Sequence, residues 1–428
     1  MVQVVIIGGG FAGPVLALSL KKHKISSAIY EVRSKDWEHG GNIALAPNAL
    51  RVMDSIGLYD EIRSSGFNYQ ELAFTSGNGH TLGKFLNGSI KEYHYPALRI
   101  HRTIVREALR KKVEEVGIPM YYEKKCTKVV GEDDNSATVE FADGEKVTAD
   151  FVVGADGIHS HVRQFIHPCE PEFSGLMGIM AQVDASELRD IDHGLQLPAM
   201  LFGEKGSFAI MPSSFDGKEI GYFATIEQQD RGRDGWAKLE TDKDEMAQLL
   251  ADRFTYNGST WPEMVRALCE KTPKDTLTSW PFYSVPHMEK FSSPKARVIV
   301  IGDSAHAIPP TGGQGAAMAL EDASTLAYTL AHSYFPDFQR QYLPQLLEAW
   351  EKHRMPRLHQ VVDFTTKNGN LRKSSPHYLE QAAKEWVLWT ALKMSGETGG
   401  AQWMYSYSAE DVKKNIGETG LKTVTTWT

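Results

Sequence analysis

Residues 2 to 13 read VQVVIIGGGFAG, an apolar run that leads directly into the pattern Gly8-x-Gly10-x-x-Gly13. A second apolar run, SSAIYE, ends at Glu31, close to the spacing of about 20 residues expected for an acid that binds ribose hydroxyls. Gly8 would make the tight turn, Gly10 would let the backbone approach a pyrophosphate, and Gly13 would let a helix pack close to the strand. The stretch predicts a nucleotide-binding βαβ unit with phosphate at a helix N-terminus.

Two further segments narrow the choice of dinucleotide. Residues 145–166 read EKVTADFVVGADGIHSHVRQFI, where an apolar strand ends at Gly154 and Asp156 and is followed by Arg163 at the mouth of a helix. Residues 296–331 read ARVIVIGDSAHAIPPTGGQGAAMALEDASTLAYTLA, where another strand ends at Gly302-Asp303 before a proline-glycine loop and an alanine-rich helix.

Taken in this order, the three segments resemble the class A FAD-dependent monooxygenases, the flavoprotein aromatic hydroxylases of the p-hydroxybenzoate hydroxylase type. The loop GGQGAA followed by EDA is most similar to the salicylate hydroxylase and zeaxanthin epoxidase branch. The motifs support the resemblance over about residues 1–165 and 280–365. Residues 170–280 match only in position and general β character, and 366–428 match nothing that we can name.

The resemblance implies FAD as the cofactor and gives several residues a role in binding it. Glu31 would bind the adenosine ribose, and its charge would repel a 2′-phosphate. Arg33 would lie beside the adenine or its phosphates, Arg102 would reach the ribityl and phosphate region, and Asp303 would accept a hydrogen bond from a ribityl hydroxyl. Asp156 would orient Arg163 and neighbouring loops, in a motif that the family associates with both FAD and NAD(P)H.

The proline-glycine loop would run along the isoalloxazine ring. Reduced flavin is negatively charged at N1 and O2, and a helix that begins near Gly315 offers unpaired N–H groups and the positive end of its dipole. Glycines suit this loop because side chains would push the backbone away from the ring or because the turn needs a positive φ. The residues expected along the ring are Pro310, Gly312, Gly313, Gly315 and Ala316.

The implied reaction is oxygen transfer: NAD(P)H reduces FAD, O₂ then forms a flavin C4a-hydroperoxide, and an aromatic or polyketide-like or alkaloid-like small molecule is hydroxylated. Because the sequence has only one glycine fingerprint, NAD(P)H would bind as a transient co-substrate. No catalytic base is assigned, and His306 is interpreted as part of the loop signature. A flavin-dependent epoxidase or a drug-inactivating oxidase would use the same motifs, and a non-catalytic nucleotide-binding protein is the alternative outside enzymes.

The predicted fold is α/β, with a Rossmann-like FAD-binding domain, an inserted β-rich substrate domain and a helical C-terminal region. The expected FAD-binding domain comprises residues 1–70, 99–170 and 286–365. The substrate domain comprises 71–98 and 171–285, and 366–428 form the C-terminal region. Single helices are expected over NALRVMDSIGLYDEIRSS and DKDEMAQLLADRF, and a turn over DRGRDG.

The substrate domain supplies candidate walls for a substrate chamber. Because side chains alternate along a strand, about half of the candidates should face the flavin. Arg233 could bind a carboxylate, although an arginine in such a turn is more often a surface residue. The candidate wall residues are Phe202, Phe208, Met211, Tyr222, Phe223, Trp280, Phe282 and Tyr283.

Composition argues against several other classes of protein. The net charge of −8, with lysines and arginines scattered along the chain, does not suggest a nucleic-acid partner. Three cysteines, Cys126, Cys169 and Cys269, lack metal-type spacing and favour a reduced, cytoplasmic protein without a metal site. No apolar stretch approaches the roughly 20 residues needed to span a bilayer, and a strand beginning at Val2 leaves no room for a signal peptide. A monomer or homodimer is expected.

Overall fold

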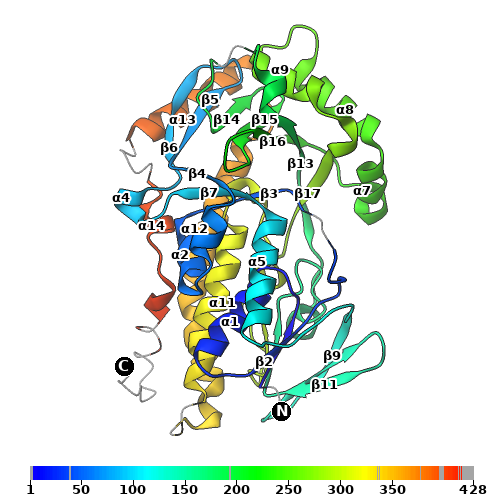
Figure 1. Ribbon diagram of the computed structural model, residues 1–428, viewed down its shortest axis with the longest axis vertical. Helices are drawn as coiled ribbons and strands as arrows, with labels where there is room; N and C mark the ends of the chain where they lie inside the picture. The colour runs from blue at the N-terminus through cyan, green and yellow to red at the C-terminus, as the bar shows by residue number, and fades with distance from the viewer. Residues whose placement is uncertain are drawn as a thin grey trace.

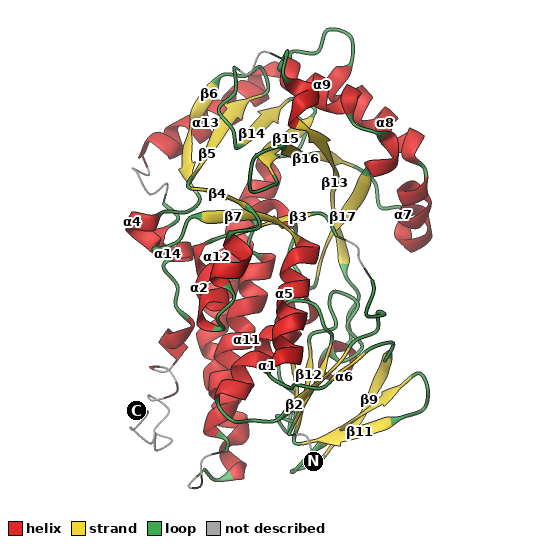
Figure 2. Ribbon diagram, viewed as in Figure 1, coloured by secondary structure: helices red, strands yellow, loops and turns green. Residues whose placement is uncertain are grey.

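The computed structural model describes residues 3–37, 40–191, 194–334, 336, 338–375, 377–394, 400–412, 414 and 416. In Figure 1 a parallel sheet lies near the N-terminus, a larger sheet lies at the opposite end of the molecule, and long helices run between them. Coloured by secondary structure in Figure 2, most strands gather at these two ends, a few lie between them, and helices fill much of the remaining space and flank the larger sheet.

The sheet near the N-terminus has five strands in the order β18-β12-β1-β2-β8. Every neighbouring pair is parallel, so the carboxyl ends of the strands meet at one edge. Strands β1, β2, β12 and β18 are buried along their whole length, which explains their continuous apolar sequences. The strands are β18 (Val298–Val300), β12 (Phe151–Gly154), β1 (Val4–Ile7), β2 (Ser27–Tyr30) and β8 (Met120–Tyr121).

Helix α1 (Ala12–Lys22) connects β1 to β2, which confirms the predicted βαβ unit. It packs against α5 (Arg102–Glu115) and against α11 (Gly315–His332), the helix that follows the proline-glycine loop. A separate antiparallel sheet precedes β12 in the chain and has the order β11-β10-β9. Its strands are β9 (Cys126–Glu132), β10 (Ala137–Phe141) and β11 (Lys146–Ala149).

The larger sheet has seven strands in the order β17-β13-β16-β15-β14-β5-β6. Strands β5 and β6 come from the turn region around SGNGH, and β5 joins the rest of the sheet by pairing in parallel with β14. The other pairings are antiparallel. The strands are β5 (Glu71–Ser76), β6 (Thr81–Leu86), β13 (Glu172–Asp184), β14 (Ala199–Gly203), β15 (Gly206–Pro212), β16 (Glu219–Glu227) and β17 (Thr278–Ser284).

Three helices cover the outer face of the larger sheet, where the sequence predicted one. Helix α8 (Lys243–Leu250) matches that prediction, but α7 (Gly232–Thr241) begins inside the expected turn DRGRDG, and α9 (Glu263–Lys271) was not predicted. The turn prediction was wrong because the segment is amphipathic: Trp236 and Leu239 are buried against the sheet. Tertiary burial of this face outweighs the local turn preference of Gly and Asp.

A three-stranded antiparallel sheet, β3-β7-β4, lies between the two larger sheets in Figure 1. Two helices replace the single helix predicted after residue 47, because Gly57 adopts a φ of +75° and ends the first. Helix α4 (Ile90–Tyr93) precedes β7. The strands are β3 (Asn42–Leu45), β4 (Phe67–Tyr69) and β7 (Ala97–His101), and the two helices are α2 (Pro47–Ser55) and α3 (Tyr59–Arg63).

The chain after α11 is mostly helical in its described part, as predicted. Helix α12 (Leu343–Leu371) runs beside α11 and reaches the proline-glycine loop. Helix α13 (Tyr378–Met394) packs against β6 at one side of the larger sheet, and α14 (Gln402–Tyr405) returns toward α2. A search of the described helices finds none with both the length and the apolar character to cross a membrane.

Candidate cofactor and substrate site

The glycine turn after β1 combines two closely packed positions with one open position. Gly8 has a φ of +112°, and a Cβ atom on it would lie 2.2 Å from the carbonyl oxygen of Ala155. A Cβ on Gly13 would lie 2.0 Å from the carbonyl oxygen of Gly8, so the start of α1 packs directly on the turn. A Cβ on Gly10 would meet no atom within 4 Å. The first and third glycines are therefore needed for packing, while the middle one faces open space.

Glu31 lies at the end of β2, next to this turn. Its Oε2 accepts a hydrogen bond from the Gly9 N–H at 2.5 Å, and its Oε1 accepts one from the Arg33 N–H at 2.8 Å. The carboxylate is half-buried and has further lone pairs with which to accept hydroxyl groups. The fold thus places an anionic acceptor beside the open glycine of the turn.

A tryptophan that the sequence analysis did not single out supports the basic residues here. The guanidinium carbon of Arg33 lies 4.8 Å from the centre of the Trp37 ring, and that of Arg106 lies 4.5 Å from it. Both contacts have cation–π geometry. Because Trp37 follows β2 and Arg106 lies on α5, no local pattern in the sequence could have paired them.

Asp156 holds two loops together at the ends of β12 and β18. Its carboxylate accepts hydrogen bonds from Ser160 Oγ at 2.5 Å and from Ser304 Oγ at 3.0 Å. The Arg163 guanidinium donates to the carbonyl oxygens of Ser304 and Ile158 rather than to Asp156. The link from Asp156 to Arg163 is indirect, through Ser160, whose Oγ also accepts from the Arg163 N–H.

Asp303 and Arg102 face each other from different parts of the chain. Arg102 begins α5, and Asp303 follows β18. Burial raises the pKa of the Asp303 carboxyl, against the positive charges of His306 and Arg102, and burial lowers the pKa of Arg102, against Asp303. The Asp303 side chain is nevertheless accessible to solvent. The Asp303 carboxyl is therefore closely surrounded by other groups and can still be reached by a ligand from solvent.

The proline-glycine loop forms a single 3₁₀ turn, η4 (Pro310–Gly312), immediately before α11. Gly313 has a φ of +64°, which favours glycine, and a Cβ on it would meet nothing within 4 Å. Gly315 begins α11, and the nearest atom to a Cβ there would be a side-chain carbon of Ile308, 3.9 Å away. The side chain of the N-cap residue Gln314 does not cap this helix N-terminus. The first N–H groups of the helix and the positive end of its dipole therefore remain available to a ligand near Ala316.

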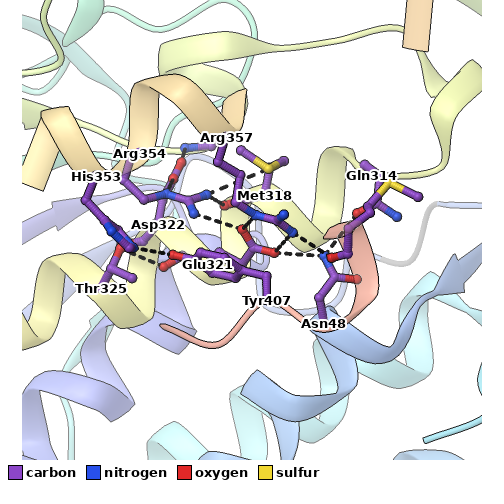
Figure 3. Close-up of polar contacts among 12 residues, drawn as sticks. Asn48, Gln314, Met318, Glu321, Asp322, Thr325, His353, Arg354, Arg357 and Tyr407 are labelled. Atoms are coloured by element: carbon purple, nitrogen blue, oxygen red, sulfur yellow. Dashed lines mark hydrogen bonds and ion pairs between the residues drawn. The ribbon is translucent and has the colours of Figure 1, made fainter. Parts of the chain in front are cut away.

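A buried network of charges fixes α11 behind the loop (Figure 3). Arg354 donates to Glu321 at 2.8 Å and to Asp322 at 2.8 Å, and Arg357 donates to both oxygens of Glu321 at 2.7 Å. Asp322 also accepts from the Gly302 N–H, next to Asp303. Asn48 on α2 bridges Glu321 to Gln314 in the loop. The two hydrogen bonds from its Nδ2 are 2.7 and 3.0 Å long.

The charges in this network are mutually compensated. Burial acts to raise the pKa of Asp322, but the charges of His306 and Arg354 outweigh it and hold that pKa at about 2. The pKa of Glu321 is also lowered, because Arg354 and Arg357 outweigh its burial. The EDA segment, used in the sequence only to choose a branch of the family, is therefore the anchor of the loop.

His306 belongs to this network and not to an open catalytic position. It is buried, and its Nε2 lies 2.5 Å from Asp322 Oδ2. The interpretation of His306 as a residue that positions the loop agrees with these contacts. Among the described residues no group of histidine, cysteine and acidic side chains could hold a metal ion.

The candidate wall residues separate onto the two faces of the larger sheet, as alternation predicted. Phe208, Tyr222 and Tyr283 belong to the core beneath the outer helices. The opposite, inner face carries Phe202, Met211, Phe223, Phe282 and Trp280. Phe282 stacks on Phe223 with ring centres 5.9 Å apart, and the Arg102 guanidinium lies 4.5 Å from the centre of the Trp280 ring.

Comparison with known proteins identifies the fold that carries this geometry. Residues 1–365 match the model of the FAD binding domain family. The chain belongs to this family. Salicylate hydroxylase of Pseudomonas putida is 29% identical over 86% of the chain and 85% of its own length, and asperlicin C monooxygenase of Petromyces alliaceus is 30% identical over 83% of the chain and 77% of its own length.

A solved structure agrees with the sequence matches. A salicylate hydroxylase substrate complex superimposes with a TM-score of 0.76 at 22% identity, over 97% of the chain and 98% of the known structure. The match extends past residue 365 into the C-terminal helices, where the sequence motifs showed no resemblance that could be named. The protein is thus an FAD-dependent monooxygenase, and the resemblance to class A hydroxylases is confirmed.

The three cysteines and Arg233 were expected to be structural or surface residues. The three cysteines are free thiols, and burial raises the pKa of Cys126 and of Cys269 to about 12, so both are protonated and structural at neutral pH. Arg233 is exposed on α7, as expected for a surface residue.

Proposed function

We propose that the edge of the parallel sheet binds FAD with Glu31 at the adenosine ribose, Arg33 near the adenine or its phosphates, and Asp303 at a ribityl hydroxyl. Open space at Gly10, beside the Glu31 carboxylate, supports the first part of this assignment. The solvent-accessible carboxyl of Asp303 opposite Arg102 supports the second. The full proposed set is Gly8, Gly10, Gly13, Glu31, Arg33, Arg102, Asp156, Asp303, Pro310, Gly312, Gly313, Gly315 and Ala316.

Asp156 has a different role in this set. Its carboxylate is occupied by Ser160, Ser304 and the backbone N–H of His161. It would therefore act on the cofactor by holding the loop that carries Asp303 rather than by direct contact. Gly8 and Gly13 likewise allow the close packing on which the cofactor site depends.

The proposed reaction is hydroxylation of an aromatic small molecule, with NAD(P)H and O₂ as co-substrates. Bound FAD would accept a hydride from NAD(P)H and activate O₂ for transfer of one oxygen atom to the substrate. The N–H groups at the start of α11 would stabilise negative charge at the ring edge. The single observation that supports an aromatic substrate is the inner face of the larger sheet, where Met211, Phe223 and Phe282 form an apolar wall. Such a wall would also exclude water, which favours oxygen transfer over release of peroxide.

The same proposal covers the organisation of the enzyme. The chain would divide into an FAD-binding domain of residues 1–70, 99–170 and 286–365 and a substrate domain of 71–98 and 171–285, followed by the helical region 366–428. Pairing of β5 with β14 supports assignment of 71–98 to the substrate domain. The free cysteines favour a reducing, cytoplasmic location, and a monomer or homodimer is proposed.

The test uses the purified enzyme reconstituted with FAD. It is mixed with NADH or NADPH, ¹⁸O₂ and a panel of hydroxybenzoates, hydroxybenzamides and quinolones. We expect one panel member to accelerate NAD(P)H oxidation and to gain one labelled oxygen atom, measured by mass spectrometry. Flavin-dependent NAD(P)H consumption that yields only H₂O₂ with every compound would contradict hydroxylation of this class of substrate. FAD that remains in the supernatant after acid precipitation would show non-covalent binding.

A further inference from the structure

Arg99 lies on the face of the small sheet that looks toward the larger sheet. Its neighbours along β7, Leu98 and Ile100, point the other way and belong to the core of the nucleotide-binding half. Because side chains alternate along a strand, Arg99 shares the opposite face with Ala97. In register, Arg99 pairs with Ala44 on one side and with Phe67 on the other. The guanidinium group therefore projects from the centre of this three-stranded sheet.

The opposing wall is the inner face of the larger sheet. Met211 on β15 forms an apolar cluster with Tyr69 and Ala97, which fixes the two sheets against each other. On the other side of Arg99, a Cβ added to Gly41 would lie 2.7 Å from Met180 Sδ on β13, so the sheets are also in contact there. Arg99 thus lies between two points of contact, in the space bounded by the apolar wall of the proposed substrate chamber.

Arg99 has no compensating charge among the residues that the structure describes. No carboxylate lies within ion-pair distance of it, and its buried Nε has no hydrogen-bond partner. Apart from burial, the pKa of Arg99 responds to the Tyr69 hydroxyl and to a second cation, Arg102. Burial lowers the pKa of Arg99 to about 10, so the guanidinium still carries its charge at neutral pH. Part of Arg99 reaches solvent, but its Nε is buried without a partner, and an anionic partner stabilises a charge in such surroundings.

A second hydrogen-bond donor lies beside Arg99. Asn87 Nδ2 donates to the hydroxyl oxygen of Tyr69 at 2.7 Å, which leaves the Tyr69 hydrogen for another acceptor. Tyr405 on α14 fixes Asn87 in turn, by donating to its Oδ1 at 2.7 Å. Burial raises the pKa of Tyr69 to about 12, although the Arg99 charge acts against it, so the hydroxyl is protonated at neutral pH. Arg99 and Tyr69 therefore present a cation and a neutral donor to the same space.

We propose that Arg99 and Tyr69 bind the carboxylate of the substrate, and that the enzyme acts on aromatic acids in preference to neutral aromatic compounds. A carboxylate would supply the missing counter-charge and would accept from both donors. The inference rests on the proposed function, because it places the substrate in the chamber described there. It assigns Arg99 to substrate specificity, whereas Arg102, three residues further along the chain at the start of α5, would lie beside Asp303 and the cofactor.

The test measures binding without turnover, so that it does not depend on oxygen transfer. FAD-loaded enzyme is titrated with two matched pairs of probes: salicylate and salicylamide, and 3-hydroxybenzoate and 3-hydroxybenzamide. The change in flavin absorbance reports the dissociation constant. For the wild type we expect at least one acid to bind at least about tenfold more tightly than its amide. Arg99→Gln should weaken binding of that acid by about tenfold to a hundredfold and leave amide binding within about threefold.

Two further variants separate charge from shape. Arg99→Lys keeps the positive charge and should retain part of the preference for the acid, while Tyr69→Phe should weaken acid binding by about threefold to tenfold. If Arg99→Gln does not fold, Arg99→Lys and Tyr69→Phe still test whether the two side chains bind the carboxylate. Arg233→Gln, which removes an exposed arginine of the substrate half, is the matched control and should behave as the wild type.

Several results would overturn the inference. They are equal binding of acids and amides by the wild type, no spectral change with any acid up to millimolar concentration, or an FAD-loaded Arg99→Gln enzyme whose acid preference is unchanged. Failure of the proposed function looks different. In that case the acids bind in an Arg99-dependent manner, but no labelled oxygen enters any product.

Discussion

Two regions of this monooxygenase bury positive charge in opposite ways. Around α11, Arg354 and Arg357 are paired with Glu321 and Asp322, and every group in the network has a partner of opposite charge. Between the two antiparallel sheets, Arg99 is densely surrounded but has no acidic partner among the described residues. The difference indicates that the network around α11 is complete without a ligand and serves as scaffold. Arg99, by contrast, is suited to binding an anionic ligand.

The largest effect should follow from breaking the completed network. Glu321→Gln would leave Arg354 with Asp322 alone and would remove the carboxylate that pairs with Arg357. Removal of one partner from a buried ion pair costs about 3–5 kcal/mol. We expect the free energy of unfolding in urea to fall by about this amount. A fall in the free energy of unfolding of less than about 1 kcal/mol would mean that the network does not act as a scaffold. Lys352→Gln, at an exposed ion pair on α12, provides the control and should cost less than about 1 kcal/mol.

Acid should weaken the same network. The folded-state pKa of Asp322 is about 2, below its usual value near 3.9, so its contribution is present above about pH 4 and is lost as the pH falls through the folded value. The expected loss is about 2–3 kcal/mol between pH 5 and pH 2. Urea unfolding across this range should show a steeper decline for the wild type than for Asp322→Asn. Parallel declines would assign the acid sensitivity to other groups.

Asp303→Ala tests whether the solvent-accessible carboxyl opposite Arg102 binds the cofactor. Loss of a charged acceptor should weaken FAD binding by about 1–3 kcal/mol, measured by fluorescence titration of the apoenzyme. Glu31→Ala should have a similar effect at the other end of the cofactor. Because neither residue holds core elements together, their far-ultraviolet circular dichroism should match the wild type. Wild-type FAD affinity in both variants would refute their proposed roles.

The smallest effect is expected at the proline-glycine loop before α11. Gly313 has a φ of +64°, and valine there would cost about 1–2 kcal/mol of backbone strain. A distorted loop would admit water to the ring, so we expect less hydroxylated product per NAD(P)H oxidised and more H₂O₂. Gly217→Val, at another positive φ on an exposed turn of the substrate half, controls for strain alone and should leave this ratio unchanged. Full coupling in Gly313→Val would place the loop away from the chemistry.

Much of the cofactor edge could be predicted from local sequence. Gly8, Gly13 and Glu31 act within one βαβ unit, where spacing along the chain fixes spacing in the fold. Alternation along the strands likewise predicted that the candidate wall residues would divide between two faces. By contrast, the single helix after residue 47 and the turn at DRGRDG were wrong, because the first depended on the backbone at Gly57 and the second on burial of Trp236.

The sequence by itself determined the nucleotide-binding unit, the order of the three motifs and hence the class of cofactor and chemistry. Only the tertiary structure decided which charges are paired. Glu321 meets Arg354 across two helices, Tyr405 supports Tyr69 through Asn87, and Arg99 meets no acid among the described residues. The physical reason is range: turns, caps and strand periods are set by neighbours in sequence, whereas the counter-charge of a buried group comes from whichever segment the fold packs against it.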